Sequence, residues 1–349
     1  MKKKQRTPIF KLVKNLILNG TLFFGLVFLT FWAIFKDQDI NQVFDIISKA
    51  IFPFVLMGIG LMLTYYALEA INIYRLMKSF GEDITFRRAL KYVFINFFFC
   101  SVTPSATGGQ PLEIYYMTKD GISGAHATIS VLLMTAGIQF AVVFLGILGG
   151  ILGNDKISGP MALLYTYGVV VNIVALVVML LCVFWTKGVK GFIHNFFGLL
   201  NKMGIHKALA WRDSAEKGLE KYNEGSNFIK RNIKELRFTM IRGVLQMSAF
   251  YLIPYMVFLA LGLSGHNIFE FFVLQSILFI STSGIPLPGA IGASESVFLG
   301  LYMTVFPEEI LSSAMLLNRG INFYLFVLVS MTVVLVNIAL LKRRKKNNK

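Results

Sequence analysis

The 349-residue sequence is poor in charged residues, in cysteine and in histidine. Only 15% of its residues are charged, and its two Cys, Cys100 and Cys182, both lie in apolar segments. The four His are scattered without ligand spacing, so no metal site is expected. No glycine-rich loop precedes Lys and Ser or Thr, and no Ser or Cys stands in a nucleophile motif. These absences argue against ATP-driven pumping by this chain, catalytic residues, metals and cofactors.

Apolar residues dominate instead, since 56% of the sequence is hydrophobic and 33 residues are Phe. Six apolar runs are each about 20 residues or longer, enough at 1.5 Å per residue to cross roughly 30 Å of hydrocarbon. The corresponding crossings are 16–35, 51–70, 125–152, 160–184, 240–263 and 310–341. The sequence therefore predicts an all-α polytopic membrane protein that forms a single integral membrane domain over 1–349.

The 34 basic residues, set against 18 acidic ones, are clustered between the apolar runs. Four segments hold six, five, eleven and six Lys or Arg, namely 1–15, 71–92, 185–238 and 342–349. Three other segments together hold three basic and six acidic residues, namely 36–50, 153–159 and 306–309. Because cytoplasmic segments carry the excess of Lys and Arg, this pattern places both termini and the 185–238 loop in the cytoplasm.

The 185–238 loop has helical periodicity and, at about 50 residues, is too short for a substantial catalytic domain. Its basic residues are mixed with five acidic ones, as on a solvated helix, which argues against nucleic-acid binding. We expect a helical cytoplasmic loop. The basic excess suits contact with anionic lipid headgroups on that leaflet, so the expected partner is the membrane.

Two further apolar segments, 86–120 and 268–305, are interrupted by Pro and Gly. Basic residues flank the first segment and acidic residues follow the second, so we expect hairpins that enter from the cytoplasmic and the outer face, respectively. The predicted topology is six full transmembrane helices plus two re-entrant hairpins in an inverted-repeat-like arrangement. Eight full spans are the alternative.

The two broken segments resemble each other. In "SVTPSATGGQPLE", Glu113 follows Ser101 by twelve residues, and in "SGIPLPGAIGASE", Glu295 follows Ser283 by the same spacing. A Pro comes three residues after each Ser, and glycines lie between that Pro and the Glu. Matching interrupted segments in two halves of a transporter indicate a binding site built on inverted repeats. Chance similarity between two short motifs is the alternative.

Broken helices survive in a membrane only where protein covers them or where they line a wet cavity. The helix that begins near Pro111 would point the positive end of its dipole at such a cavity, which suits a phosphate. We therefore expect the breaks to bind substrate; their residues are Thr103, Pro104, Gly108, Gly109, Pro286, Pro288, Gly289 and Gly292. A helix–helix corner packed on small residues is the alternative.

Charged side chains within or beside apolar segments each cost roughly 2.5–3.5 kcal/mol unless they are paired or hydrated. Arg319 has no acid within a helical turn, so its partner must come from another helix: Glu295 first, Glu113 second. We expect all three to contact the substrate, and an architectural ion pair is the alternative. Glu69 and Arg75, near the end of the second apolar run, are expected to be interfacial anchors.

The two motifs in their full setting are "INFFFCSVTPSATGGQPLEIYYM" and "ISTSGIPLPGAIGASESVFLGLY". They resemble the paired signatures of the lysylphosphatidylglycerol synthase transmembrane-region family, the flippase-like membrane portion of the bacterial multiple peptide resistance factor. The resemblance covers about residues 10–340, and the PxPGxxGxxE element at 286–295 is fairly specific. It implies movement of lysylphosphatidylglycerol or another phospholipid between leaflets, resistance to cationic antimicrobial peptides and a bacterial plasma-membrane location.

Two departures from the family pattern bear on function. Full-length members carry a C-terminal cytosolic domain that makes the lipid from lysyl-tRNA, whereas this sequence ends at Lys349, so we expect no aminoacyl transfer from it. Many relatives have a basic residue shortly after the glycines of the first motif; Glu113 stands there instead and would favour a cationic headgroup. The alternatives are a phosphatidylglycerol lysyltransferase-type membrane enzyme and a membrane partner of a separate synthase or glycosyltransferase. The protein could also form a homo-oligomer.

Overall fold

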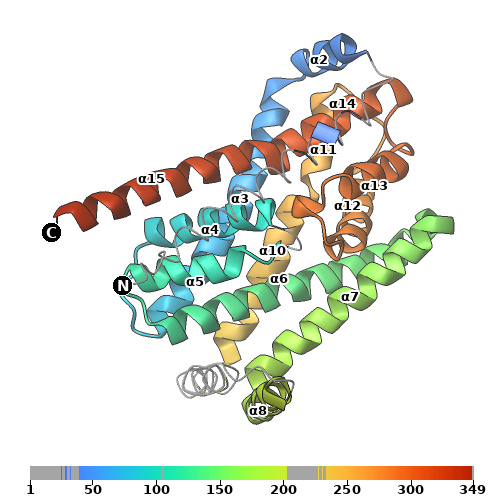
Figure 1. Ribbon diagram of the computed structural model, residues 1–349. Coiled ribbons are helices and arrows are strands. Elements are labelled where there is room, and N and C mark those ends of the chain that lie inside the picture. Colours follow the sequence, from blue (N-terminus) through green and yellow to red (C-terminus); the bar gives the residue numbers. More distant parts are fainter. Residues whose placement is uncertain are drawn as a thin grey trace.

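The computed structural model describes residues 39–103, 106–202 and 233–347, and also Gly25, Phe28, Leu29, Trp32, Asn227 and Lys230. Every regular element within these residues is helical (Figure 1). Five stretches are long and apolar enough to cross a membrane: Phe52–Ser79, Gly124–Leu152, Gly159–Leu181, Ile233–Ala260 and Glu308–Leu340. They match five of the six predicted crossings, and the sixth, 16–35, lies outside the described residues except at four helical positions. The predicted class, an all-α polytopic membrane protein, is confirmed.

Three of the spans are single helices: α3 (Phe52–Ser79), α6 (Gly124–Leu152) and α7 (Gly159–Phe184). The other two change geometry on the way. Helix α10 (Ile233–Tyr251) leads into α11 (Ile253–Ala260), where Pro254 lacks the N–H that would continue the ladder. Helix α14 (Glu308–Arg319) leads through the π-helical turn η4 (Gly320–Tyr324) into α15 (Leu325–Asn347). Such π turns inside long helices are frequent at functional sites.

Hairpin 1 consists of α4 (Phe86–Val102) and α5 (Gly109–Lys119). Hairpin 2 consists of α12 (Ile268–Ser283), the short η3 (Pro288–Ala290) and α13 (Ala293–Tyr302). At 1.5 Å per residue the 11-residue α5 and the 10-residue α13 are about 16 and 15 Å long. Either helix covers only half of a roughly 30 Å hydrocarbon layer. These lengths favour re-entrant hairpins over eight full spans, and the re-entrant position stays a prediction.

The two hairpins enter the bundle from opposite ends, as contacts along α6 show. At the beginning of α6, Gly124 lies against Thr118, which is next to the end of α5. At the end of α6, Gly153 lies against Val273, near the start of α12. In Figure 1, α4 and α5 lie toward one end of α6, and α12 and α13 lie toward the other. The tips of the hairpins therefore point toward each other, and η3 packs against α4.

Helix α7 fixes hairpin 2 from the side. Asn172 donates from Nδ2 to the carbonyl of Ile280 at 3.3 Å and to Oγ of Ser283 at 2.9 Å. These bonds reach the last turn of α12, where helical carbonyls lack internal partners. A Cβ at Gly168 would overlap the backbone of Ile280, so this glycine permits the close approach of the two helices.

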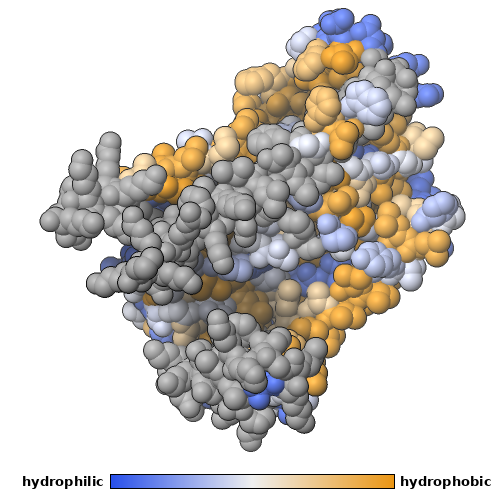
Figure 2. Space-filling view, viewed as in Figure 1, coloured by the Kyte–Doolittle hydropathy of each residue, from blue (hydrophilic) through white to orange (hydrophobic). Residues whose placement is uncertain are grey.

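The outer surface is apolar in the way a lipid-facing surface requires. Exposed large apolar side chains occur along α7 and α15, for example Leu163 and Leu335. Hydrophobic side chains cover much of the coloured surface in Figure 2. Of the predicted 185–238 loop, α8 (Thr186–Lys202) is helical, and most of the residues up to 232 lie outside the described part of the chain. The cytoplasmic position of this loop stays a prediction.

Candidate functional site

A cavity of about 310 Å³ lies where the tips of the two hairpins meet. Its walls come from α3, α4, α10, α12, α13, α14, the loop around η3 and the π turn η4. Apolar and aromatic side chains form most of the lining, as in ligand pockets generally. The polar side chains that line it include Ser101, Gln275, Thr282, Ser283, Ser294, Glu295, Asn318, Arg319 and Asn322.

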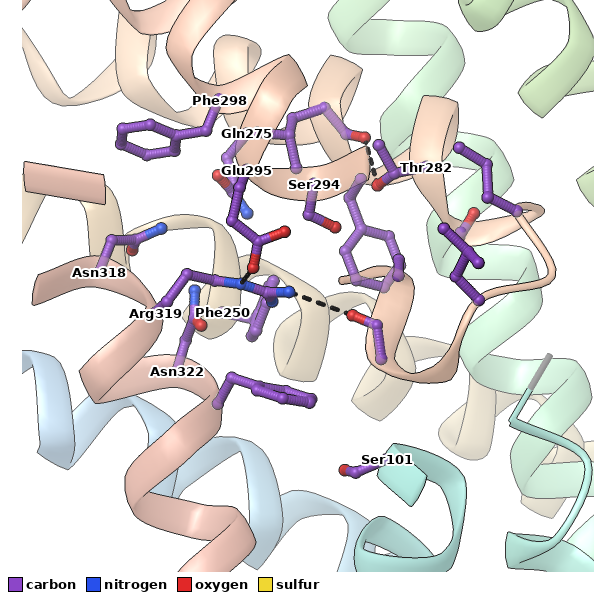
Figure 3. Close-up of a pocket in the computed structure, with 18 of the residues that line it drawn as sticks. Ser101, Phe250, Gln275, Thr282, Ser294, Glu295, Phe298, Asn318, Arg319 and Asn322 are labelled. Atoms are coloured by element: carbon purple, nitrogen blue, oxygen red, sulfur yellow. Dashed lines mark hydrogen bonds and ion pairs between the residues drawn. The ribbon is translucent and has the colours of Figure 1, made fainter. Parts of the chain in front are cut away.

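The central feature of the cavity is an ion pair between hairpin 2 and the last span. Arg319 Nε donates to Glu295 Oε1 at 2.6 Å, and the side chains are 12% and 1% exposed, respectively. The N–H of Gly292 donates to Glu295 Oε2 at 2.7 Å, so one carboxylate also caps the start of α13. Figure 3 shows the two charged groups pointing toward each other, with Ser101 on the opposite side of the cavity. The predicted pairing of Arg319 with Glu295 is confirmed.

Arg319 also holds the tip loop of hairpin 2. Its Nη2 donates to the carbonyl of Gly289 at 3.1 Å, and its guanidinium carbon lies 4.7 Å from the ring centroid of Phe323. Gly289 has φ +58°, a conformation that favours glycine, and a Cβ there would overlap the Phe323 ring. Gly292 has φ +86° directly before α13. The glycines of PxPGxxGxxE thus permit a turn that the arginine then fixes.

The tip of hairpin 1 is held by a threonine hydroxyl and by close glycine packing, without an ion pair. Thr103 Oγ1 donates to the carbonyl of Phe99 at 2.6 Å and accepts from the N–H of Gly108 at 3.0 Å. A Cβ at Gly108 would overlap Thr103, and one at Gly109 would overlap Asn96 and Cys100 of α4. Both glycines therefore allow α5 to pack directly on α4. This is the packing role that the sequence left open as the alternative.

The predicted site residues thus divide into two groups. Gly289, Glu295 and Arg319 line the cavity. Seven others are absent from its lining and shape or pack the hairpins around it: Thr103, Gly108, Gly109, Glu113, Pro286, Pro288 and Gly292. Pro104 lies outside the described residues. From hairpin 1, the cavity is lined by Phe97, Cys100, Ser101 and Ala106.

Backbone strain is concentrated at the two tips. Within the described ranges, Ala106 (φ +53°) and Ala290 (φ +51°) are the non-glycine residues with positive φ. A left-handed conformation costs an alanine about 1–2 kcal/mol, and such strain clusters at ligand sites. Both alanines line the cavity, one from each hairpin. This symmetry between the tips was not predicted from the Pro and Gly pattern.

Glu113 and Glu69 are both buried in the protein near α4. Glu113 is 0% exposed, and neither carboxylate oxygen has a hydrogen-bond partner within the described part of the chain. Glu69 is 5% exposed and accepts from Asn96 Nδ2 at 3.3 Å and from Gln246 Nε2 at 3.1 Å. The expectation that Glu69 is an interfacial anchor is wrong, because its carboxylate is buried and hydrogen-bonded between α3, α4 and α10 instead of facing outward. Arg75 is exposed, and its role as an anchor stays a prediction.

Several cavity residues were not singled out from the sequence. Asn318 and Asn322 flank Arg319 in "NRGIN", a polar group inside an otherwise apolar run that could have indicated them. Gln275 accepts through Oε1 from the hydroxyl of Tyr302 at 2.8 Å and joins the two arms of hairpin 2. Nothing in the local sequence distinguishes Gln275 from a packed polar residue of a helix.

Comparison with known proteins places this fold in a family. The family model described as "Lysylphosphatidylglycerol synthase TM region" matches residues 16–330, which include both hairpins and every wall of the cavity. The chain belongs to this family. It is 23% identical over 333 residues to a UPF0104 membrane protein of Archaeoglobus fulgidus, covering 90% of this chain and 95% of that protein. A UPF0104 membrane protein of Pyrococcus horikoshii is 23% identical over 327 residues, covering 90% and 94%.

Proposed function

We propose that this member of the family is a lipid translocase that moves a phospholipid headgroup between the two leaflets through the cavity between the hairpins. The observation that carries the proposal is the buried Glu295–Arg319 pair in a largely apolar cavity of about 310 Å³, reached by broken helices from both ends. Intramembrane charges that face a cavity mark substrate pathways in transporters. Broken helices at the interface of two halves mark their binding sites.

The chemistry of the cavity suits a headgroup that carries a phosphate and an amine. Arginine has five N–H donors in a planar fork that matches phosphate, and two of those of Arg319 are engaged in the described contacts. Glu295 offers a carboxylate to a cationic group. At about 310 Å³, the cavity lies at the lower end of ligand-pocket sizes, which suits a headgroup whose acyl chains stay in the lipid. The proposed substrate is lysylphosphatidylglycerol.

The physical benefit of such a cavity is that it replaces water around the headgroup. Moving a polar group into hydrocarbon without a hydrogen-bond partner costs several kcal/mol of free energy, so unassisted movement of a lipid headgroup between leaflets is slow. Side chains such as Ser101 and Asn322 can partner the headgroup on the way. A cationic lipid delivered to the outer leaflet of a bacterial plasma membrane lowers the negative surface potential that attracts cationic peptides. Peptide resistance is thus the proposed consequence.

Reconstituted protein tests the proposal directly. Proteoliposomes containing headgroup-labelled lysylphosphatidylglycerol or phosphatidylglycerol should show movement of label between leaflets with the wild type. The Glu295→Gln variant should lose this movement while staying folded, because the amide can still accept from Arg319 but carries no charge. Glu309→Gln, which removes an exposed carboxylate at the start of α14, is the matched control and should behave as wild type. Lipid movement at the wild-type rate in Glu295→Gln would refute the role of the pair. A new lipid in the lipid extract of cells that express the protein would indicate an enzyme.

A further inference from the structure

Glu69 and Glu113 form a second polar site, behind the cavity and separate from the Glu295–Arg319 pair. Gly109 and Glu113 are four residues apart on α5 and therefore share one face of that helix. This face lies against α4, because the Cβ position of Gly109 meets Asn96 and Cys100. Asn96 in turn donates to Glu69. Glu69 and the face of α5 that carries Glu113 therefore meet at the same side chain of α4, Asn96, which places the two carboxyl groups in one site.

No basic side chain within the described ranges forms an ion pair with either carboxyl group. On α10 the nearest one, Arg242, donates to Asn72 and pairs with Glu235. The titratable groups that face the site are Tyr65 and Tyr66 of α3 and Cys100 of α4, all uncharged at neutral pH.

On the other helices packed against α3, α4 and α5, no described side chain forms an ion pair with Glu69 or Glu113. The charged side chains described on these helices have other partners or are exposed. His126 contacts Glu82, Lys91 and Arg88 contact Asp120, Lys78 pairs with Asp83, Lys119 lies over Tyr115, and Arg75, Arg87, Lys234 and Arg237 are exposed. The remaining titratable side chains described there are Tyr74, Tyr92, Tyr116, Tyr251, Tyr255 and Tyr324.

An ionised carboxylate in such surroundings is costly. Removing a charge from water without a partner costs several kcal/mol or more, and a carboxyl group avoids this cost by binding a proton. Two nearby carboxylates cannot both be ionised cheaply, and they commonly share one proton. Glu113, fully buried with two unpartnered oxygens, is the group that gains most from that proton. Glu69 already accepts two amide hydrogen bonds, which stabilise its ionised form.

We propose that Glu69 and Glu113 form a proton-binding site whose occupancy is coupled to lipid movement. A hydronium ion from the solvent transfers its proton to a carboxylate oxygen of Glu113: one O–H bond of the hydronium breaks, one O–H bond forms on the carboxyl group, water is released, and one of the two negative charges is removed. The site touches the cavity through α4: Cys100 lines the cavity and its Sγ donates to Asn96 Oδ1 at 3.4 Å, and Asn96 in turn donates to Glu69. The coupling rests on the proposed function, whereas proton binding itself does not.

Infrared difference spectroscopy of the full-length protein in lipid nanodiscs measures the proton without any transport assay. Near neutral pH, the wild type should show the carbonyl band of a buried protonated carboxylic acid. Glu113→Gln should lose this band. Glu69→Gln should shift or remove the band, and it serves as the second variant if Glu113→Gln does not fold. Asp83→Asn, which removes an exposed carboxylate, is the control and should leave the band unchanged. A wild-type spectrum without the band would overturn the proposal.

Two further arms separate the alternatives. Replacing choline chloride by sodium chloride should leave the band unchanged; loss of the band in sodium would identify a cation site instead and overturn the proton assignment. In proteoliposomes, a pH gradient should change the rate of wild-type lipid movement, and Glu113→Gln should lose this response. An unresponsive wild type would refute the coupling. A band without any lipid movement would refute the proposed function and leave the proton site standing.

Discussion

Hairpins 1 and 2 carry an acid at the same position of the same short motif, yet the two acids lie in opposite surroundings. Glu295 lines a cavity, pairs with Arg319 at 2.6 Å and accepts from the N–H of Gly292. Glu113 is fully buried away from the cavity, with no hydrogen-bond partner in the described part of the chain. The arginine makes the difference, since the last span delivers it to hairpin 2.

The glycines of the two motifs also have different roles. In hairpin 2, Gly289 and Gly292 adopt positive φ and form the turn that Arg319 holds. In hairpin 1, Gly108 and Gly109 have ordinary helical geometry and serve close packing on α4. The shared motif thus specifies a break in both hairpins, while neighbouring helices decide whether the break binds a charge. This difference supports assigning the headgroup to hairpin 2 and the proton to hairpin 1.

The largest expected effect is on stability when each acid is replaced by leucine. Glu295→Leu leaves the buried Arg319 without its partner and should lower the free energy of unfolding by roughly 3–5 kcal/mol. Glu113→Leu removes a buried polar group without partners and should raise it by about 1–3 kcal/mol. Thermal unfolding of the purified variants in detergent measures both. If both substitutions changed the free energy of unfolding in the same direction, the two acids would lie in similar environments.

A smaller effect is expected from adding a methyl group to one glycine. Gly109→Ala overlaps Asn96 and Cys100, so it should force α5 away from α4 and cost about 1–3 kcal/mol. Gly300→Ala in α13 meets open space and is the matched control; it should gain roughly 0.5–1 kcal/mol from better helix propensity. Unfolding midpoints of the two variants provide the comparison. Equal tolerance would contradict the close contact at the start of α5.

The smallest effect concerns how the hairpins are closed. In hairpin 1, Asp120 contacts Lys91, Tyr92 and Arg88. Burial alone would raise the pKa of Asp120, but the hydrogen bonds from Lys91 and Tyr92 and the charges of Lys91 and Arg88 outweigh it and hold that pKa below its ordinary value. A lowered folded-state pKa means that Asp120 stabilises the fold above about pH 3.9 and that this stabilisation is lost as pH falls through the folded-state pKa.

In hairpin 2 the corresponding contact is the neutral hydrogen bond from Tyr302 to Gln275, which does not titrate in acid. Hydrogen exchange around Lys91 and Asp120 should therefore rise in acid more than hydrogen exchange around Gln275 and Tyr302, after correction for intrinsic exchange. Asp120→Asn should remove this difference. An equal response of both hairpins in the wild type would show that Asp120 does not hold hairpin 1 closed.

Much of this arrangement could be predicted from the sequence, because length and hydropathy specify spans and Pro and Gly specify breaks. The five described spans and both interruptions follow from such local signals. The Glu295–Arg319 pair is the first of two pairings that the cost of an unpaired charge in the membrane suggests. The role of Gly109 and the burial of Glu69 do not. Both depend on how closely α4 approaches α5 and on how far α3 continues, which are properties of packing between helices.

The central claim is that the charges of Glu295 and Arg319 serve a lipid headgroup and are not needed merely to hold the fold together. The double variant Glu295→Gln with Arg319→Gln tests it, because it removes both charges and leaves neither one buried and unpaired. We expect this variant to unfold near the wild-type temperature and to move neither labelled lysylphosphatidylglycerol nor phosphatidylglycerol in proteoliposomes. Lipid movement at the wild-type rate by the folded double variant would contradict the account.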